Sequence, residues 1–405
     1  MFDIETARKI IVESATPLPA EKVGLDTLAG RVAAEDVRAA ITQPPFRASA
    51  MDGYAVRFED ARRAGATLKV IGEIAAGASV SPEIGPSQAA RIFTGGVLPE
   101  GADHVIIQED VSRDGDAIIV ERDQPAARNI RAAGIDFEAG DTLAPEGARL
   151  NAIHASLFAA ANLSAICVYA RPRVAVFANG DELAEPGATL APGQIVNSTH
   201  YALRCLAERW GAQAGYAGCA RDTIDDVKRL FECAAGADVI VPLGGASVGD
   251  YDFVKQAFAE LGGTLLFENV AVKPGKPVWF GALDDACVLG LPGNPASALV
   301  CAVIFLAPLV EAMQGLAPRA ALPLQRARLT SSLQKNGARP ALIRARTCLD
   351  EDGALYVCPR AKQDSALLKP FADSNSLIFR PADAPALDAG GVCEIILFDP
   401  AEFSI

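Results

Sequence analysis

The chain has 405 residues, of which 50% are hydrophobic and 21% are charged, and it carries a formal net charge of -13 at pH 7. This length exceeds one ordinary core, so we expect about two to four domains of a globular enzyme, not a disordered or fibrous chain. No tract dense in Lys and Arg offsets the acidic charge, which argues against a nucleic-acid partner. An anionic ligand must therefore be held by local cations and backbone N–H groups.

The cysteines and histidines point away from a metal centre built on them. The nine cysteines include no C-x-x-C pair, and most lie in apolar runs. We therefore expect free, buried thiols. His104, His154 and His200 are too few and too widely separated for a catalytic triad or a zinc site. Each is expected to be a structural or surface histidine.

Two segments bear on membranes and localisation. The N-terminus, MFDIETARKII, has mixed charge and a helical pattern, unlike a signal peptide. The most apolar run, 296–310, contains Pro308 and is followed by Glu311, so it falls short of the roughly 18 uninterrupted apolar residues of a membrane span. We expect a buried helix there, no membrane partner and a cytoplasmic protein.

Residues 1–40 together with 141–170 are expected to form an extended and helical N-terminal region. Within it, LDTLAGRVAAEDV predicts a short apolar helix that ends at Gly30, followed by a strand. Residues 41–140 contain the β-like runs LKVIGEI, AARIFTG, HVIIQED and AIIVER, the last two joined through Asp114-Gly115, a favoured hairpin pair. This segment is expected to be an all-β insertion domain.

Between residues 171 and 315, apolar strands alternate with amphipathic helices, which predicts a doubly wound, mostly parallel sheet. Asn197 or Ser198 is expected to cap one of these helices and Asp222 another. GLAPRAALPL reads as a linker, and 324–405 predicts a small β-barrel or sandwich. The predicted fold class is a multidomain α/β protein with an all-β insertion, an N-terminal extended and helical region and a C-terminal β-barrel-like domain.

Three polar loops of the α/β part each follow the carboxyl end of a strand: ANGDE (178–182), GGASVGDYD (244–252) and GLPGNPAS (290–297). Open parallel sheets bind ligands at these ends, where glycines let phosphate approach backbone N–H groups. One such loop alone is most simply a tight connection. Three of them favour a phosphate site with Mg²⁺, which prefers carboxylate and phosphate oxygens. The carboxylates of these loops are Asp181, Glu182, Asp250 and Asp252.

AVKPGKP (271–277) places Lys273 and Lys276 among prolines in an otherwise acidic chain. Cations fixed in a rigid turn suit a small anion. The alternative is an ordinary surface ion pair with acids such as Glu182 or Asp252, which would contribute roughly 0–1 kcal/mol.

Seven motifs taken in order resemble one family, the molybdopterin molybdenumtransferases, which are related to the C-terminal domain of gephyrin. They are PLPAEKVGLDTLAGRVAAEDV, SAMDGYAVR, RNIRAAG, NGDEL, GGASVGDYD, VKPGKP and GLPGNPAS. The resemblance implies an L-shaped homodimer in which the partner's β insertion closes over adenylated molybdopterin on the doubly wound domain. The implied reaction inserts molybdate into the dithiolene and, with Mg²⁺ as cofactor, releases AMP. A molybdopterin adenylyltransferase is the implied partner protein.

The resemblance also implies roles for individual residues. The catalytic set is Asp52, Thr94 and Asp136 on the insertion side and Glu182, Asp222 and Asp252 in the strand-end crevice, with Asp52, Glu182 and Asp252 as metal ligands. The substrate-binding set is Gly244, Gly245, Ser247, Gly249, Pro292, Gly293, Asn294 and Pro295. The molybdate-binding set is Lys273, Lys276, Ser297, Arg339 and Ser365. Taken singly, the insertion residues would be read only as turn residues, since Asp-Gly pairs are common in turns.

The sequence departs from the family pattern at Arg47-Ala48 before SAMDG, at Ile135, at Asn179 before GDE, and at Pro242-Leu243. These departures leave open a paralogue that binds the pterin as a carrier or scaffold and has lost metal insertion. The retained carboxylates and both lysines favour the enzyme. A nucleotide-modifying hydrolase that shares only the α/β domain is disfavoured, because the flanking regions match as well.

Overall fold

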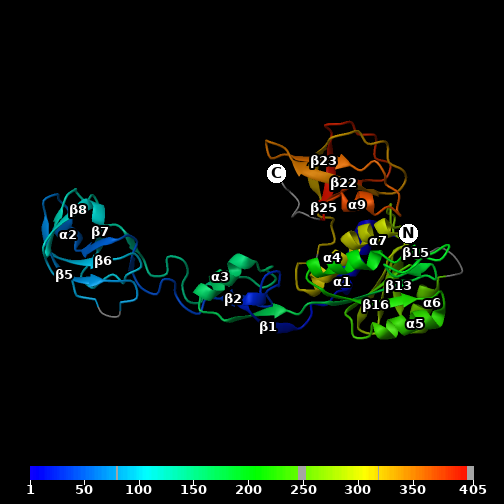
Figure 1. Ribbon diagram of the computed structural model, residues 1–405, viewed down its shortest axis with the longest axis horizontal. Coiled ribbons are helices and arrows are strands. Elements are labelled where there is room, and N and C mark those ends of the chain that lie inside the picture. Colours follow the sequence, from blue (N-terminus) through cyan, green and yellow to red (C-terminus); the bar gives the residue numbers. More distant parts are fainter. Residues whose placement is uncertain (79–80, 245–251, 318, 399–405) are drawn as a thin grey trace.

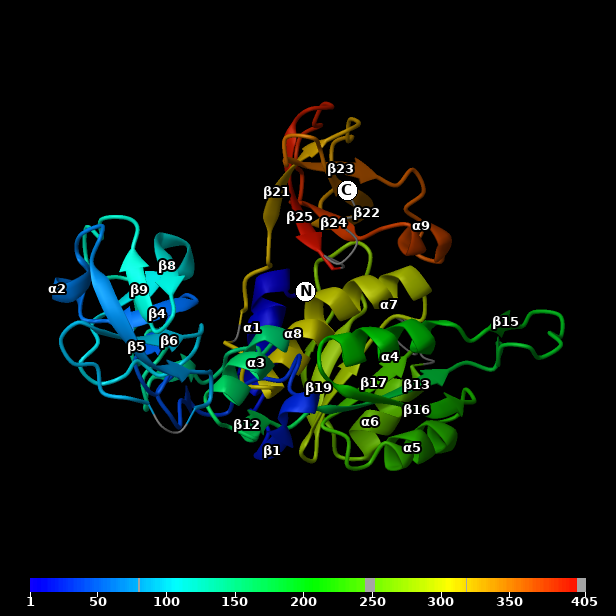
Figure 2. The same ribbon diagram turned by 60° about the vertical axis from the view of Figure 1, so that its left-hand side comes forward.

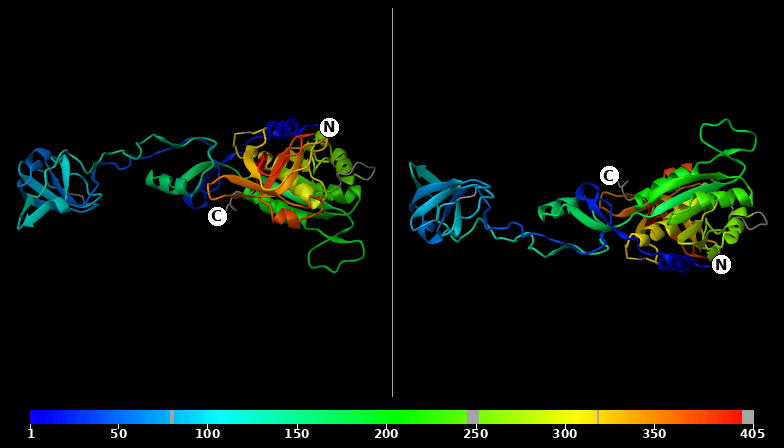
Figure 3. Two further views of the ribbon diagram at one scale, coloured as in Figure 1. Left: turned by 90° about the horizontal axis from the view of Figure 1, so that it is seen from above. Right: turned by 90° about the horizontal axis from the view of Figure 1, so that it is seen from below.

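The computed structural model describes residues 1–78, 81–244, 252–317 and 319–398. The molecule is elongated: the all-β insertion lies at one end, and the α/β domain with the C-terminal barrel lies at the other (Figure 1). A small region around α3 (Ala152–Ala160) lies between them. Extended chain segments join the insertion to this region, and the views from above and below show the same separation (Figure 3). The predicted multidomain fold class is confirmed.

The α/β domain is built on a six-stranded sheet with the order β16-β13-β17-β20-β19-β18. Its strands are β13 (Arg173–Asn179), β16 (Gln213–Ala220), β17 (Val239–Leu243), β18 (Thr264–Glu268), β19 (Trp279–Leu283) and β20 (Ala286–Gly290). The first four neighbours pair in parallel, whereas β19 pairs antiparallel with both of its neighbours, β20 and β18. Val176 packs into the core on one face and Phe177 into the core on the other, so both faces are covered.

Helices cover this sheet on both sides (Figure 2). α5 (Ile224–Cys233) and α6 (Phe253–Glu260) pack on one face, and α4 (Thr199–Arg209) and α7 (Pro295–Cys301) pack on the other. The N-terminal helix α1 (Ile4–Ser14) packs on α8 (Ala307–Met313).

The expected buried helix is confirmed. α7, a π-helical segment (Ala302–Leu306) and α8 are continuous over Pro295–Met313, long and apolar enough to cross a membrane by length and composition. However, 89% of its most apolar stretch is buried inside the protein, as in the core helix of a soluble protein. No second helix of this kind occurs among the described residues.

The insertion contains a six-stranded sheet with the order β7-β4-β6-β5-β9-β8. Its strands are β4 (Gly53–Val56), β5 (Thr67–Ile74), β6 (Gln88–Ile92), β7 (His104–Ile107), β8 (Val111–Asp114) and β9 (Ala117–Val120), beside the short helix α2 (Phe58–Ala61). One detail of the prediction was wrong. The hairpin at Gly115 joins β9 to β8, because a 3-10 turn at Gln108–Asp110 separates β8 from β7.

The central region and the C-terminal barrel complete the chain. Two antiparallel pairs, β1 with β12 and β2 with β11, form the central region, and β3 pairs with β10 on the way to the insertion. These strands are β1 (Ala20–Gly24), β2 (Val37–Arg38), β3 (Ala48–Ser49), β10 (Ile130–Arg131), β11 (Thr142–Ala144) and β12 (Ala165–Tyr169). The helix expected before Gly30 is only a 3-10 turn, Leu25–Thr27.

The C-terminal strands close into a barrel, as the strand-rich sequence predicted, with the order β21-β23-β22-β24-β25. The elements are β21 (Gln325–Leu329), β22 (Ala341–Leu349), β23 (Leu355–Pro359), α9 (Lys369–Ala372), β24 (Ser376–Arg380) and β25 (Val392–Leu397).

Helix caps and cysteines differ from the predictions. Thr223 caps α5, since its hydroxyl accepts the N–H of Asp226, and Asp222 does not. Ser198 stands at the start of α4 but makes no side-chain cap. The expectation of mostly buried thiols was wrong, because four of the nine are exposed and three are buried. The exposed thiols are those of Cys205, Cys233, Cys348 and Cys358.

Candidate functional site

A cleft of about 1040 Å³ opens at the carboxyl ends of β13, β17 and β20. Eight of the predicted site residues line it: Glu182, Asp222, Gly244, Lys276, Pro292, Gly293, Asn294 and Pro295. α4 and α7 both begin at its edge, at Ser198 and Asn294, and neither start has a side-chain cap in the described part of the chain. Free N–H groups at helix starts favour an anion in this cleft.

Glycine lets the three strand-end loops approach one another. Gly244 has φ +93°, and a Cβ there would lie 2.8 Å from the backbone oxygen of Asn179. A Cβ at Gly293 would lie 3.5 Å from the Cα of Gly244. At Gly180 a Cβ would overlap the carboxylate of Glu182, which lies over it. The loops therefore form one continuous floor in which backbone meets backbone.

The floor of the cleft is acidic. Burial and the carboxylates of Glu185, Glu182, Asp222 and Asp181 raise the pKa of the Cys219 thiol to about 11. Among the described residues that line the cleft, Lys276 alone carries a positive side chain. The carboxylates of Glu182 and Asp222 therefore oppose the attraction of the helix starts and Lys276 for an anionic ligand, and a cation bound with the ligand would offset them.

Asp222 is held in place by the neighbouring strand-end loop. Its Oδ1 accepts a hydrogen bond from Nδ2 of Asn179 at 2.7 Å, and its Oδ2 accepts the backbone N–H of Asp181 at 3.4 Å. Because Thr223 caps α5, the carboxylate of Asp222 is not used by that helix and remains at the cleft.

The segment 271–277, which we call the lysine turn, connects the α/β domain to the C-terminal barrel through hydrogen bonds. The N–H of Lys273 donates to the carbonyl of Pro340 at 2.9 Å, and the guanidinium of Arg339 donates to the carbonyl of Val272 at 3.4 Å. Lys273 and Lys276 are exposed, and neither has an ion pair among the residues that the structure describes. The alternative that Lys276 pairs with Asp252 is therefore wrong for this structure, since Asp252 instead lies 3.1 Å from Lys255.

Ser365 and Ser297 lie beside the start of α7. Ser365 accepts a hydrogen bond from Nδ2 of Asn294 at 3.2 Å through its hydroxyl, and its carbonyl accepts the N–H of Ala296 at 2.9 Å. These bonds bring a barrel loop to the edge of the cleft. Ser297 is buried in the first turn of α7 and does not line the cleft.

Asp252 acts locally as the cap of α6. Its Oδ1 accepts the N–H of Lys255 at 3.1 Å, and burial raises its pKa. It does not line the cleft. The loop before it lies outside the described residues, and with it the predicted site residues Gly245, Ser247 and Gly249 and the carboxylate of Asp250.

In the insertion, Asp52 and Thr94 form one unit. The N–H and the hydroxyl of Thr94 both donate to Oδ1 of Asp52, at 2.7 and 2.8 Å, and the backbone hydrogen bond is the main reason that the pKa of Asp52 is lowered. Arg91 lowers it further and is fixed by a hydrogen bond to the carbonyl of Gly53 at 3.1 Å. Asp52 is thus an exposed, ionised carboxylate at the start of β4, an interior strand of the sheet.

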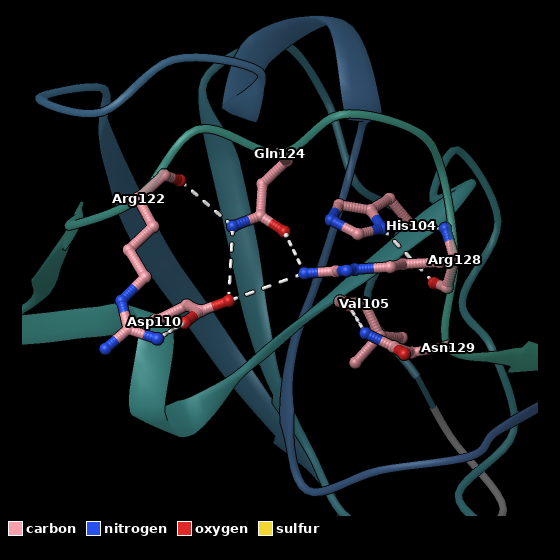
Figure 4. Close-up of polar contacts among 7 residues, drawn as sticks. All are labelled: His104, Val105, Asp110, Arg122, Gln124, Arg128 and Asn129. Atoms are coloured by element: carbon pink, nitrogen blue, oxygen red, sulfur yellow. Dashed lines mark hydrogen bonds and ion pairs between the residues drawn. The ribbon is translucent and has the colours of Figure 1, made fainter.

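A polar cluster, in which Asp110, Gln124 and His104 are buried, braces the chain next to Asp52 (Figure 4). The carboxylate of Asp110 lies 3.2 Å from Arg122 and 3.6 Å from Arg128. Asn129 donates to the carbonyl of Val105 at 2.8 Å, and its own carbonyl accepts the N–H of Ala50 at 2.9 Å. Gln124 and His104 complete the cluster. Because Ala50 is part of the SAMDG turn, its hydrogen bond to Asn129 ties that turn to the cluster.

The insertion residues do not reach the cleft of their own chain. Asp52 and Thr94 lie in the insertion, beside β4 and β6, at the opposite end of the molecule from β13, β17 and β20 (Figures 1 and 2). Asp136 lies apart from both groups, in a hollow that Asp141 and Phe137 also line near the central region. One chain therefore brings together the α/β part of the predicted site but not its insertion part.

Comparison with known proteins identifies the family. Residues 2–162 match the model of the MoeA N-terminal region (domain I and II), residues 175–312 that of the probable molybdopterin binding domain, and residues 326–398 that of the MoeA C-terminal region (domain IV). The chain belongs to the MoeA family.

Full-length relatives agree. The molybdopterin molybdenumtransferase of Haemophilus influenzae is 34% identical over 99% of this chain and 98% of its own length, and that of a Nostoc species is 35% identical over 91% and 87%. A crystal structure of the molybdopterin biosynthesis MoeA protein from Pyrococcus horikoshii superposes with a TM-score of 0.84, at 32% identity, over 98% of this chain and 99% of that one. The transferase class predicted from the sequence is confirmed.

Several MoeA cleft residues were not singled out as site residues by the sequence analysis. Asn197 and Thr199 at the start of α4 line the cleft, as do Phe253 and Asn269. Asn179 was noted only as a departure from the family pattern. Its position as the last residue of a strand before a glycine loop was the available signal, since such positions face the crevice.

Acid stability offers a test of the cluster in Figure 4. Nδ1 of buried His104 lies 3.0 Å from the backbone nitrogen and 3.1 Å from the carbonyl oxygen of Arg128, and burial lowers the pKa of His104 below its usual value of about 6.5. As the pH falls below about 6.5 the unfolded chain binds a proton that the folded chain does not, so stability present at higher pH is lost.

We therefore expect the urea midpoint of the protein to fall between about pH 7.5 and about pH 5.5 by more than that of His104→Gln. Glutamine keeps an acceptor for Arg128 but does not titrate. An equal fall in both proteins would show that His104 does not cause this part of the acid sensitivity.

Proposed function

We propose that this protein inserts molybdate into the dithiolene of adenylated molybdopterin and releases AMP in a Mg²⁺-dependent reaction. The observation that carries the proposal is the cleft at three strand ends, where glycine loops, two uncapped helix starts, the carboxylates of Glu182 and Asp222 and the cation of Lys276 come together. Curated relatives that match 99% of the chain are named for molybdenum transfer to molybdopterin. The buried apolar helix supports a cytoplasmic enzyme.

The cleft suits a flat ring with an anionic tail. Its apolar lining, Leu183, Ile195, Val196 and Phe253, supports a place for the pterin ring, while the starts of α4 and α7 offer N–H groups to phosphate oxygens. This combination of an apolar wall and a polar floor is typical of nucleotide-like ligands.

The carboxylates fit Mg²⁺ when the substrate supplies the remaining oxygens. No three His, Cys, Asp or Glu side chains are arranged to hold a metal in the described ranges. Mg²⁺ commonly binds one or two carboxylates together with substrate phosphates. Glu182 would hold it at the cleft, with Asp52 from the insertion, and bound Mg²⁺ would neutralise phosphate charge above the acidic floor. Asp252, which caps α6 and pairs with Lys255, is the weakest of the three proposed ligands.

The lysine turn supports a molybdate site. Lys276 and Lys273 are exposed cations, and the hydrogen bonds of Arg339 and Ser365 bring the barrel to the same edge. We propose that these side chains hold the dianion, with the backbone N–H of Ser297 in the first turn of α7 as a further donor. Prolines on both sides limit the conformational entropy that the turn loses when molybdate binds.

We also propose a homodimer that completes each site. Asp52 and Thr94 lie at the end of the molecule opposite to the cleft, so they reach a cleft only in another subunit (Figure 1). The partner's insertion would then cover the cleft of the first subunit. Asp136 would belong to the insertion side of that site. A molybdopterin adenylyltransferase would supply the adenylated substrate.

Purified protein incubated with adenylated molybdopterin, Mg²⁺ and molybdate should release AMP and yield molybdenum cofactor. Asp52→Asn should keep the fold, because asparagine also forms such turns, yet lose AMP release. Glu182→Gln should behave likewise. Mixing the two variants should restore part of the activity, since one of the two sites in a mixed dimer would contain both native carboxylates.

Two results would count against this assignment. Failure to complement after confirmed subunit exchange would mean that each site is built within one chain. Tight pterin binding without AMP release by the native protein would favour the carrier or scaffold alternative.

Lys276→Ala should raise the molybdate concentration needed for half-maximal turnover by one to two orders of magnitude, about 1.4 kcal/mol per tenfold. Affinity for the adenylated pterin should be retained, and excess molybdate should restore turnover, because only the anion site is weakened. Lys22→Ala, which removes another exposed lysine far from the cleft, is the control. An unchanged molybdate dependence in Lys276→Ala would leave this lysine as an ordinary surface cation.

A further inference from the structure

The floor of the cleft contains a buried side-chain amide in which only one of the two polar groups is hydrogen-bonded. Asn179, the last residue of β13, is 9% exposed. Its Nδ2 donates to Oδ1 of Asp222 at 2.7 Å. Its Oδ1 is buried and has no hydrogen-bond partner among the described residues. The side chain therefore satisfies one neighbour and leaves its own acceptor unpaired.

The unpaired acceptor of Asn179 carries a cost to the stability of the fold. A buried acceptor without a partner has lost its hydrogen bonds to water and gained none in return, which destabilises the folded state. Leucine has nearly the same shape as asparagine and carries no polar atom, so it would fill the position without that loss. What asparagine supplies and leucine does not is the N–H bond to Asp222.

The backbone fixes the direction in which Asn179 points. Asn179 pairs with Ala220 of the neighbouring strand β16, and its carbonyl lies so close to Gly244 that a Cβ there would be 2.8 Å away. Asp222 is two residues beyond Ala220. Its N–H donates to Oδ1 of Asp181 at 3.3 Å, and the N–H of Asp181 donates back to Oδ2 of Asp222 at 3.4 Å.

The short bond from Asn179 is thus the strongest restraint that the described residues place on the Asp222 carboxylate. Its length of 2.7 Å is that of a charge-assisted hydrogen bond, whereas the bond from Asp181 is long. With Thr223 acting as the cap of α5, nothing else in the described structure requires Asp222 to be a carboxylate.

We propose that Asn179 is a positioning residue that holds the Asp222 carboxylate ready to accept hydrogen bonds from molybdopterin. The proposal deepens the proposed function and rests on it for the identity of the ligand. A carboxylate held in one rotamer loses little conformational entropy when the ligand arrives. The unpaired oxygen of Asn179 is the consequence of directing its donor end to Asp222.

The test compares Asn179→Leu with a matched control, Asn375→Leu. Asn375 is fully buried in the barrel and both ends of its amide are paired, with the N–H and the carbonyl of Thr347 at 2.8 and 2.9 Å. We expect Asn375→Leu to lower the thermal unfolding midpoint and leave affinity for molybdopterin unchanged. Asn179→Leu should leave the midpoint unchanged or raised while weakening molybdopterin binding about tenfold, or 1.4 kcal/mol.

A double-mutant cycle identifies the route of the effect. In an Asp222→Asn background, Asn179→Leu should cause no further loss of molybdopterin affinity. An equal further loss would show that Asn179 does not act through Asp222. A lowered midpoint with unchanged affinity would make Asn179 a structural residue and overturn the proposal. Because the readouts are affinity and stability, a protein that binds molybdopterin but releases no AMP would refute the proposed reaction without affecting this test.

Discussion

The meeting of three strand ends at Gly244 is the constraint on which the rest of the site depends. β13, β17 and β20 are neighbours in the sheet, and the loops that follow them approach until a Cβ at Gly244 would touch the Asn179 carbonyl. Glu182 and the start of α7 line the cleft at these loops, and Asp222 joins them from the end of the neighbouring strand β16.

Such a floor collects negative charge, and the chain offsets little of it. Four carboxylates act on Cys219 from this side, whereas Lys276 is the one positive side chain among the described residues that line the cleft. A phosphate ligand is then attracted chiefly by helix starts and by a cation that it brings with it. This electrostatic balance supports the proposed dependence on Mg²⁺ in a protein whose net charge is -13.

Much of this was predictable from sequence, and the limits have physical causes. Strands and glycine loops repeat locally, so the doubly wound sheet and the grouping of Glu182 with Gly293 followed from the order of elements. The cap of α5 at Thr223 instead of Asp222 was missed because adjacent polar residues are equally able to cap. The unpaired oxygen of Asn179 was not predictable either, since it depends on a contact between two loops 43 residues apart in sequence.

Extended chain segments separate the insertion, which carries Asp52, from the α/β domain, which carries the cleft (Figure 1). Thr94 and Arg91 lower the pKa of Asp52, and the cluster around Asp110 fixes the chain beside it, so the carboxylate is ionised and oriented before any ligand binds. Forming the turn does not require this ordering of Asp52, because a turn alone needs only an Asp-Gly pair. The ordering of Asp52 is explained if the insertion contacts a second surface that binds this carboxylate in one orientation. In the proposed homodimer the acidic cleft of another copy would be such a surface, and Asp52 together with Glu182 of that cleft would hold Mg²⁺.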